Sequence, residues 1–275
     1  MKVSYKKMIL AIGVVIFLVF LGYIIYEGYN SYRIKHEIDD IRAGIESEKT
    51  IIHAAGGIIG KDGELHTYTN SLEAIQGSIA AGNHFIEIDF IQTTDKKVIC
   101  ASDKKYFDAT EEEFMSKPVD GEFTPMNIDI LAGVMYDNPD IYIITDVRNG
   151  NVAVMGRIRD RYPDLSDRFI VQVYHDSEYR EMKKMGYDHI IFTLYQTEDH
   201  ERSPEALQKA VKKHDYVGIT FWEEWLTDGN FYNSMMELDV PLYVHTVDDH
   251  DSIRSDIDMG MSAVYTDNTD NDWIR

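Results

Sequence analysis

Two carboxylates interrupt an apolar stretch of the sequence. Glu87 and Asp89 lie in "HFIEIDF", residues 84–90, whose other residues favour a buried strand. Residues two apart on a strand point to the same face, so both carboxylates would share one buried side. Burying unpaired like charges is costly, and a divalent cation bound by both removes that cost. The spacing therefore predicts a metal site.

A third carboxylate ends the next strand-like run. Asp146 lies late in "IYIITDV", residues 141–147, where it can add a third oxygen ligand from a neighbouring strand. Three carboxylates suit a hard cation such as Mg²⁺ or Ca²⁺ and do not suit zinc. The alternative is a buried ion pair with Arg148, which lies two residues after Asp146 on the same face. Spacing alone leaves both interpretations open.

Other polar residues also fall late in apolar runs. Each of them alone would be an ordinary core residue with its hydrogen bonds satisfied, but together they indicate one polar end of a sheet. They are His53, Gln172, Thr193, Trp222, His245 and Asp267.

Eight strand-like runs alternate with polar helical segments from residue 50 onward. This rhythm predicts an α/β fold, a (β/α)8 TIM barrel, whose catalytic groups lie at the carboxyl ends of the strands. A doubly wound open sheet is the alternative, but "HAAGG" after the first run does not match its Gly-rich nucleotide turn. The eight runs are residues 50–56, 84–90, 141–147, 168–174, 189–195, 216–222, 241–247 and 262–268.

The N-terminal region predicts a membrane anchor. Residues 8–26 carry no charge and are long enough to span a bilayer as a helix. Three lysines precede this run and acidic residues follow it, which predicts that residues 1–7 are cytoplasmic and the remainder is extracytoplasmic. The alternative is a cleaved signal peptide. Residues 27–49 are expected to form a partly helical linker to the barrel, residues 50–275.

The charge balance excludes one class of partner. Acidic residues outnumber basic residues 48 to 27, giving a formal net charge of −21. Without a stripe of Lys or Arg suited to phosphate backbones, nucleic acid is not expected as a partner. The single cysteine, Cys100, rules out an intramolecular disulfide framework.

Several motifs in order resemble the glycerophosphodiester phosphodiesterase family of the PLC-like phosphodiesterase barrels. They are "IIHAAGG", "YTNSLEAI", "FIEIDFIQTTDKKVI", "IYIITDVR", "YVHTVDD" and "VYTDN", which together cover essentially all of residues 50–269. The resemblance implies a metal-dependent enzyme that cleaves a phosphodiester between an alcohol such as glycerol and a head group. It also implies that Glu87, Asp89 and Asp146 hold the metal.

The resemblance further implies roles for individual residues. His53 would be one of two catalytic histidines, acting as base or nucleophile. Asn70 would arrange the metal or phosphate site, and Arg148 would hold a phosphate oxygen. Gln172 and Trp222 are expected to contact the substrate. The plainer alternatives are a helix cap for Asn70, an ion-pair partner for Arg148 and ordinary core packing for Trp222.

The chain departs from the family pattern at two positions. Ala54 stands where members commonly carry an arginine, and Ser102, in "VICASD", stands where they carry the second catalytic histidine. Serine is a poor proton donor to an alkoxide near neutral pH, and general acid catalysis contributes about 10²- to 10⁴-fold. His66 and His175 are the candidates to replace the missing histidine from neighbouring loops.

Two functions follow from these residues. The first is an active phosphodiesterase, acting outside the cytoplasmic membrane on glycerophosphodiesters, phospholipid head groups or a polymer with glycerol-phosphate linkages. The second is a catalytically impaired barrel that keeps the metal and binds a phosphorylated ligand or a protein partner. Retention of the three carboxylates fits both, and the serine at position 102 favours the second.

Overall fold

The N-terminal segment of the chain is one long helix. The structure is a computed structural model that describes residues 5–271, 273 and 274, with side chains described from residue 12 onward. Helix α1 (Tyr5–Glu48) runs without a break through the predicted span and the predicted linker. In the described part of the chain, one helix is long and apolar enough to cross a membrane, the stretch Ile12–Glu48 of α1. A membrane anchor and a signal sequence both meet this criterion.

The chain divides into two compact units, Met1–Asp40 and Ile41–Arg275. The second unit begins with the last turns of α1, which pack at the amino ends of the barrel strands. Gly44 lies so close to Phe85 that a Cβ atom at position 44 would be 2.8 Å from the Phe85 ring. Glu48 accepts a hydrogen bond from His84 at 2.6 Å. The segment expected to be a linker therefore ends as a part of the barrel.

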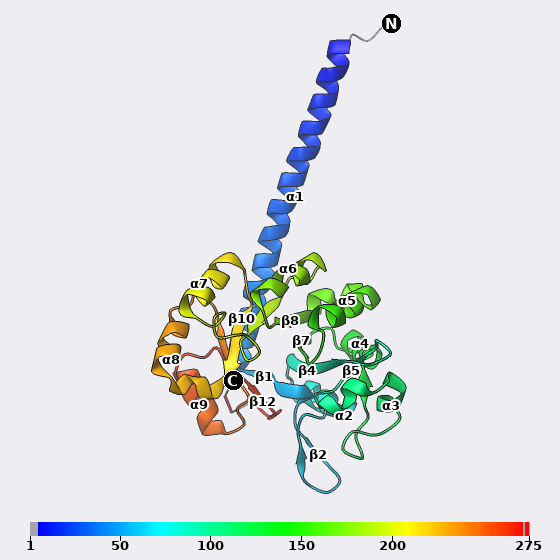
Figure 1. Cartoon of the computed structure of the whole chain (residues 1–275), viewed down its shortest axis with the longest axis vertical. Helices are drawn as coiled ribbons and strands as arrows, with labels where there is room; N and C mark the ends of the chain where they lie inside the picture. The colour runs from blue at the N-terminus through cyan, green and yellow to red at the C-terminus, as the bar shows by residue number, and fades with distance from the viewer. Residues whose placement is uncertain (1–4, 272, 275) are drawn as a thin grey trace. The chain divides into compact units, whose positions relative to one another are not determined.

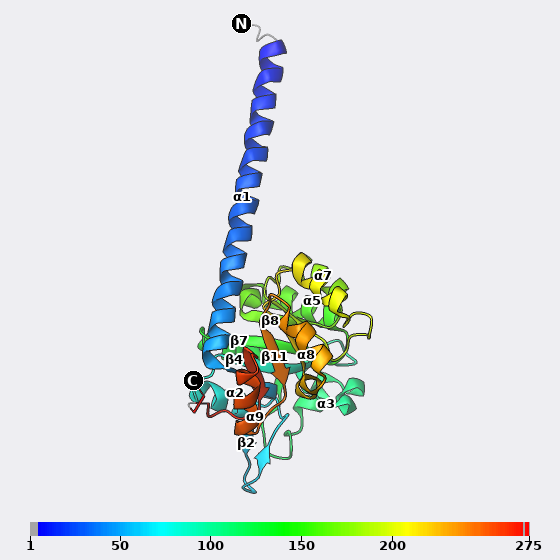
Figure 2. The same cartoon turned by 90° about the vertical axis from the view of Figure 1, so that its left-hand side faces the viewer.

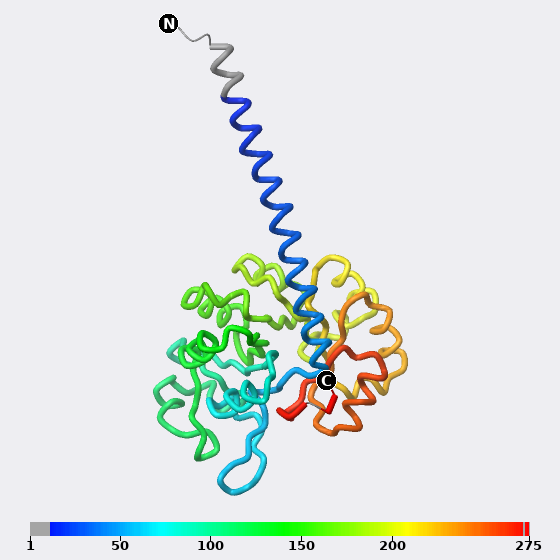
Figure 3. The backbone as a smooth tube through the Cα atoms, turned by 180° about the vertical axis from the view of Figure 1, so that it is seen from behind, coloured from blue at the N-terminus to red at the C-terminus, as the bar shows by residue number. Residues whose placement is uncertain are grey.

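Eight parallel strands close into a barrel, which confirms the predicted TIM-barrel fold. The first strand pairs with both the last strand and the second barrel strand, so the barrel is closed. Figure 3 follows the backbone around this closed path. The barrel strands are β1 (Thr50–Ile52), β4 (Phe85–Gln92), β7 (Tyr142–Val147), β8 (Phe169–Val173), β9 (Ile190–Thr193), β10 (Gly218–Trp222), β11 (Leu242–His245) and β12 (Ala263–Thr266).

Helices surround the barrel strands (Figures 1 and 2). Several begin at a Ser or Asp whose side chain accepts a hydrogen bond from the first helical turn, as at Ser71, Ser203 and Asp249. The helices of the barrel are α2 (Leu72–Ala80), α4 (Ile128–Asp137), α5 (Asn151–Arg161), α6 (Asp176–Lys184), α7 (Pro204–Lys213), α8 (Gly229–Met236) and α9 (His250–Asp258).

Strand β4 separates an apolar face from a polar one. Ile86, Ile88 and Phe90 belong to the large apolar cluster of the core. Glu87 and Asp89 alternate with them and therefore point to the opposite side, into the barrel. The shared face expected from their spacing is present.

Short elements that the sequence did not predict extend the barrel. Strands β5 (Val98–Cys100) and β6 (Met126–Asn127) continue the sheet antiparallel from the end of β4. Helix α3 (Glu111–Met115) lies between them in the sequence. A two-stranded hairpin, β2 (Ile58–Ile59) and β3 (Leu65–His66), follows β1 and projects from the barrel (Figures 1 and 2).

Candidate active site

A cavity of about 130 Å³ opens at the carboxyl ends of the barrel strands. Residues at the ends of strands all around the barrel line it, and most of them are polar. The lining residues are His53, Tyr68, Glu87, Asp146, Arg148, Gln172, Tyr195, Thr220, Trp222, His245, Thr246 and Tyr265. The predicted end of the barrel therefore carries the predicted polar residues.

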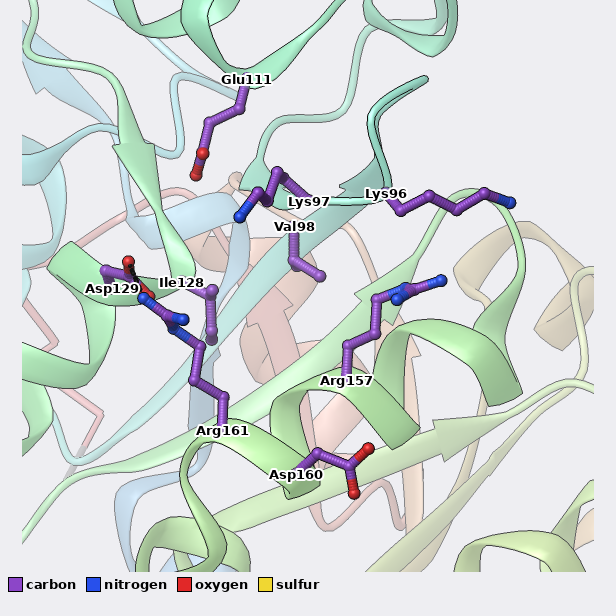
Figure 4. Close-up of a pocket in the computed structure, with 9 residues that line it drawn as sticks. All are labelled: Lys96, Lys97, Val98, Glu111, Ile128, Asp129, Arg157, Asp160 and Arg161. Carbon is purple, nitrogen blue, oxygen red and sulfur yellow. Dashed lines mark hydrogen bonds and ion pairs between the residues drawn. The ribbon is translucent and has the colours of Figure 1, made fainter.

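A larger pocket, of about 380 Å³, lies elsewhere and is shown in Figure 4. Charged side chains from α4, α5 and the turn between β4 and β5 line it, and Arg161 and Asp129 form an ion pair there. None of the residues expected in the active site lines this pocket. The strand-end cavity is consequently the candidate active site despite its smaller size.

Three carboxylates converge at this cavity. Asp89 and Asp146 are register partners on the neighbouring strands β4 and β7, and Glu87 lies two residues before Asp89. One oxygen from each of the three lies within 4.8 Å of the others, and all three side chains are buried. The chain thus has a buried acidic group that can hold a metal ion.

Only one of the two carboxylate oxygens of Glu87 has a hydrogen-bond partner among the described residues. Its Oε2 accepts a hydrogen bond from the Ala54 backbone N–H at 2.6 Å. Its Oε1 is buried and has no hydrogen-bond partner among the described residues. Burial, followed by the charge of Asp89, raises the pKa of Glu87 well above its usual value. A buried oxygen without a partner fits a cation ligand, and three carboxylates fit Mg²⁺ or Ca²⁺.

Asp89 is held on both sides. Asn70 donates from Nδ2 to Asp89 Oδ2 at 2.8 Å and accepts from the Asp89 backbone N–H at 2.9 Å. Arg148 donates to the other oxygen. The helix cap proposed as the plainer role of Asn70 is supplied instead by Ser71. Asn70 is therefore a residue that orients a carboxylate of the site.

Asp146 receives two tyrosine hydroxyls. Tyr195 donates to its oxygens at 2.7 and 3.0 Å, and Tyr174 donates to Oδ1. Burial raises the pKa of both phenols, so they stay protonated donors. Sequence reasoning missed both tyrosines, although each ends or follows an apolar run.

Arg148 bridges two of the carboxylates. It donates to Asp89, and its Nη1 lies 3.3 Å from Asp146 Oδ2. Burial opposes its charge, but Asp146 and Asp89 outweigh burial and raise its pKa above the ordinary value. The ion pair considered from the sequence is thus present. One guanidinium cannot neutralise three carboxylates, so it does not remove the case for a metal ion.

His53 lies beside the carboxylates and pairs with Asp267. Its Nδ1 is 2.8 Å from Asp267 Oδ1, and the imidazole is buried. Burial alone would lower the pKa of His53. The hydrogen bond with Asp267 and the charge of Glu87 outweigh burial and raise this pKa to about 9. The imidazole is therefore oriented, and its second nitrogen remains available for proton transfer.

Backbone conformation after His53 serves Glu87. Ala54, Ala55 and Gly56 all have positive φ, at 47°, 71° and 97°. This left-handed turn directs the Ala54 N–H to the Glu87 carboxylate. The side chain at position 54 is a methyl group, and the contact with Glu87 is made by the backbone N–H.

The candidates for a second catalytic histidine lie outside the cavity. Ser102 lines a neighbouring pocket, which it shares with Tyr68 and Asp120. His66 pairs with Asp120 at 3.1 Å, and His175 pairs with Glu201 at 2.8 Å. None of the three positions lines the cavity that holds His53. Tyr68 lines both pockets, and its ring meets the His53 ring edge-on at 4.5 Å.

The expected substrate contacts form part of the wall. Gln172 accepts a hydrogen bond from Thr193, and Trp222 stacks on His245 with ring centroids 4.7 Å apart. His245 is a second imidazole in the cavity. Burial lowers its pKa to about 3, so it is neutral.

Comparisons with known proteins bear on the fold. No protein-family model and no curated protein matches the sequence. Among solved structures, a glycerophosphodiester phosphodiesterase from Parabacteroides distasonis matches with a TM-score of 0.61 and 19% identity, over 80% of this chain and 93% of that chain. One from Thermotoga maritima matches with a TM-score of 0.59 and 18% identity, over 81% and 95% of the two chains.

A third structure was solved with a ligand. It is an Oleispira antarctica phosphodiesterase in complex with the product sn-glycerol-3-phosphate, with a TM-score of 0.58 and 11% identity over 80% of this chain and 92% of that chain. These neighbours confirm, at the level of fold, the resemblance seen in the sequence. The barrel of this chain has the fold of the glycerophosphodiester phosphodiesterases.

Proposed function

We propose that the protein is a metal-dependent phosphodiesterase that hydrolyses glycerophosphodiesters or related phospholipid or polymer phosphodiesters. The observation that carries this proposal is the buried group of Glu87, Asp89 and Asp146, beside the paired His53 and Asp267 at the mouth of the barrel. Ionisable groups with shifted pKa values, in a cavity at the carboxyl ends of barrel strands, are typical of a catalytic site.

The carboxylates would hold Mg²⁺ or Ca²⁺. Bound there, the ion would polarise a phosphoryl oxygen and stabilise the charge that develops in the transition state. Asn70 fixes Asp89, and the two tyrosines fix Asp146, so the donor oxygens are oriented before any ligand binds.

His53 would move the proton. Because Asp267 engages Nδ1, the other ring nitrogen, Nε2, exchanges a proton with the reacting group. Asp267 also stabilises the protonated imidazole. A cation held by the carboxylates would offset the charge of Glu87 that raises the pKa of His53, and the neutral imidazole, oriented by Asp267, would then act as a base or nucleophile.

Arg148 would contact the phosphate. Its Nε is buried without a hydrogen-bond partner among the described residues. An anionic phosphate oxygen would be a partner for this group, since guanidinium donors match phosphate geometry. Trp222 and Gln172 would contact the alcohol or head group from the cavity wall.

The fold neighbour bound to sn-glycerol-3-phosphate supports a glycerol-phosphate moiety in the substrate. The apolar helix α1 supports attachment to the cell membrane. The three lysines before the apolar run favour an extracytoplasmic barrel. The substrate would then be a lipid head group or another phosphodiester outside the cytoplasm.

A binding role is the second candidate, and Ser102 favours it. Position 102 lines the pocket next to the cavity, and the second imidazole in the cavity, His245, is neutral. A barrel without a proton donor for the leaving group would retain a phosphorylated ligand or recognise a protein partner without turnover.

Product release separates the two candidates. The full-length chain in detergent, with Mg²⁺ or Ca²⁺, is incubated with a panel of glycerophosphodiesters, and released alcohol and phosphate monoester are measured. The enzyme proposal expects metal-dependent product that His53→Ala abolishes. Absence of product from wild type, with ligand binding intact, would establish the binding role instead.

A further inference from the structure

A second group of metal-ligand side chains lies on the projecting hairpin, away from the barrel carboxylates. Asp62 and His66 belong to the β2–β3 hairpin, and Glu122 belongs to a tight turn at residues 119–123. One ligand atom from each lies within 4.8 Å of the others. Glu122 Oε1 accepts a hydrogen bond from the Lys61 backbone N–H at 3.0 Å and Asp62 Oδ1 accepts one from the Glu64 N–H at 3.0 Å, but the proposed hydrolysis uses none of the three side chains.

Asp120 orients the histidine of this group through the Nδ1 atom of the ring. Asp120 lies 3.1 Å from His66 Nδ1, and the imidazole packs edge-on against Phe123 with centroids 5.2 Å apart. This arrangement leaves His66 Nε2 as the nitrogen that faces Asp62, at 3.3 Å. A carboxylate on one imidazole nitrogen with metal on the other is the common arrangement in metal sites.

Glycine keeps space open among the three donors. A Cβ atom at Gly60 would lie 2.7 Å from His66 Nε2 and 2.8 Å from Asp62 Oδ1, and would also collide with Glu122 Oε1. The donors therefore converge on a region that any other residue at position 60 would fill.

The local charge is negative. Asp62, Asp120 and Glu122 supply three carboxylates. The nearby ammonium group is that of Lys61, 3.6 Å from Glu122, and the Lys61 side chain is 88% exposed. An exposed ammonium at this distance contributes little neutralisation. The Glu122 side chain is only 15% exposed, so its charge is less screened by water.

We propose that Asp62, His66 and Glu122 bind a divalent transition-metal ion, with zinc preferred. One imidazole nitrogen with two carboxylate oxygens suits zinc, whereas the all-carboxylate group in the barrel suits Mg²⁺ or Ca²⁺. Ligands of a tetrahedral zinc ion lie about 3.4 Å apart, so the side chains would close by about 1 Å. Small rotations of the exposed Asp62 and the half-buried Glu122 would achieve this.

The ion would join the hairpin, which leads into the cavity wall at Tyr68, to the 119–123 turn, which borders the neighbouring pocket. The hairpin leads directly to Tyr68 and Asn70, and the 119–123 turn carries Asp120 into the pocket that also contains Ser102. Cross-linking the two would stiffen this side of the site. The proposal does not depend on hydrolysis, and its test uses binding alone.

Calorimetric titration of zinc tests the proposal. Full-length protein in detergent is freed of metal with a chelator and titrated with Zn²⁺. Saturating Mg²⁺ is present so that the barrel carboxylates are occupied. Wild type should bind one zinc ion, and His66→Asn and Glu122→Gln should each weaken binding at least about 10-fold. His200→Asn, at an exposed histidine that pairs with Glu198, is the matched control and should bind as wild type.

Two further variants keep the test decisive. Asp120→Asn leaves all three donors in place and should weaken binding by about 10- to 100-fold, because it removes the group that orients His66. Glu87→Gln should leave zinc binding unchanged, since that residue belongs to the barrel site. The proposal is overturned if folded wild type, judged by circular dichroism, takes up no zinc. It is equally overturned if His66→Asn binds zinc with the wild-type affinity, which would mean that the cluster is only an ion-paired histidine.

Discussion

Asp89 and Asp146 face each other as register partners on neighbouring parallel strands, and Arg148 bridges them. This relationship determines the charge balance of the site. The arginine neutralises one charge of the pair, while Glu87, two residues before Asp89, keeps an oxygen without a partner. Protein groups therefore neutralise only part of the negative charge of the carboxylates, and the site can still bind a cation.

The tyrosines on Asp146 should stabilise the fold. Tyr174→Phe removes a buried hydroxyl that donates to Asp146 and accepts from the Val147 N–H at 2.7 Å. Leaving buried polar groups without a partner costs about 1–3 kcal/mol, so urea unfolding should show a loss of that size. Tyr136→Phe removes an exposed hydroxyl that donates to Asp164 and should cause no measurable loss. Equal losses in both variants would contradict this account of Asp146.

The contribution of His53 to stability should depend on pH. In metal-free protein its pKa is raised to about 9, from an ordinary value of 6.5. The protonated pair with Asp267 therefore stabilises the folded state fully below about pH 6.5, and this contribution is lost as the pH rises through about 9. Denaturant unfolding in EDTA measures the free energy of unfolding of wild type and of His53→Gln. The amount by which wild type exceeds His53→Gln should fall by about 1–3 kcal/mol from pH 6.5 to 9.

A control variant tests the cause of this pH dependence. Asp267→Asn removes the partner of His53. The difference in free energy of unfolding between Asp267→Asn and the double variant His53→Gln/Asp267→Asn should therefore change little from pH 6.5 to 9. If wild type and His53→Gln differ by the same amount at both ends of the range, the imidazole is not held in its charged form.

The sequence predicted the barrel well because its signals are local. Each barrel strand is a short apolar run, and the helices between them carry capping residues such as Ser71 and Asp249. The facing of Glu87 and Asp89 followed from their spacing alone. The three metal-ligand candidates could therefore be named without a structure.

Other parts of the site depend on contacts between distant segments. Tyr195 reaches Asp146 across 49 positions of sequence, and no local pattern marks that contact. The pairing of His53 with Asp267 lies where β1 meets β12 and spans 214 positions. The neighbouring pocket of Ser102 depends on β5, a strand of three residues that is too short for a periodic signal.

The missing histidine should be testable by restoring it. Ser102→His places an imidazole in the pocket next to the cavity, with Tyr68 lining both. If the proton donor is what limits turnover, Ser102→His should raise the release of product from a glycerophosphodiester by about 10-fold or more. Ser102→His with Tyr68→Ala should raise it further, because the ring that borders both pockets is removed. Ser102→Asn is the control for size and polarity, and no gain in either histidine variant would show that another step limits turnover.

The central claim is that the buried carboxylates hold a divalent cation, and titration calorimetry with Mg²⁺ and Ca²⁺ tests it most directly. Full-length wild type, stripped of metal, is expected to bind one ion of this kind at the barrel. Glu87→Gln should weaken this binding at least about 100-fold, because it removes the oxygen that lacks a partner. Glu64→Gln, at an exposed glutamate of the hairpin, should bind as wild type. Binding that is unchanged in Glu87→Gln, or absent in folded wild type, would contradict the account.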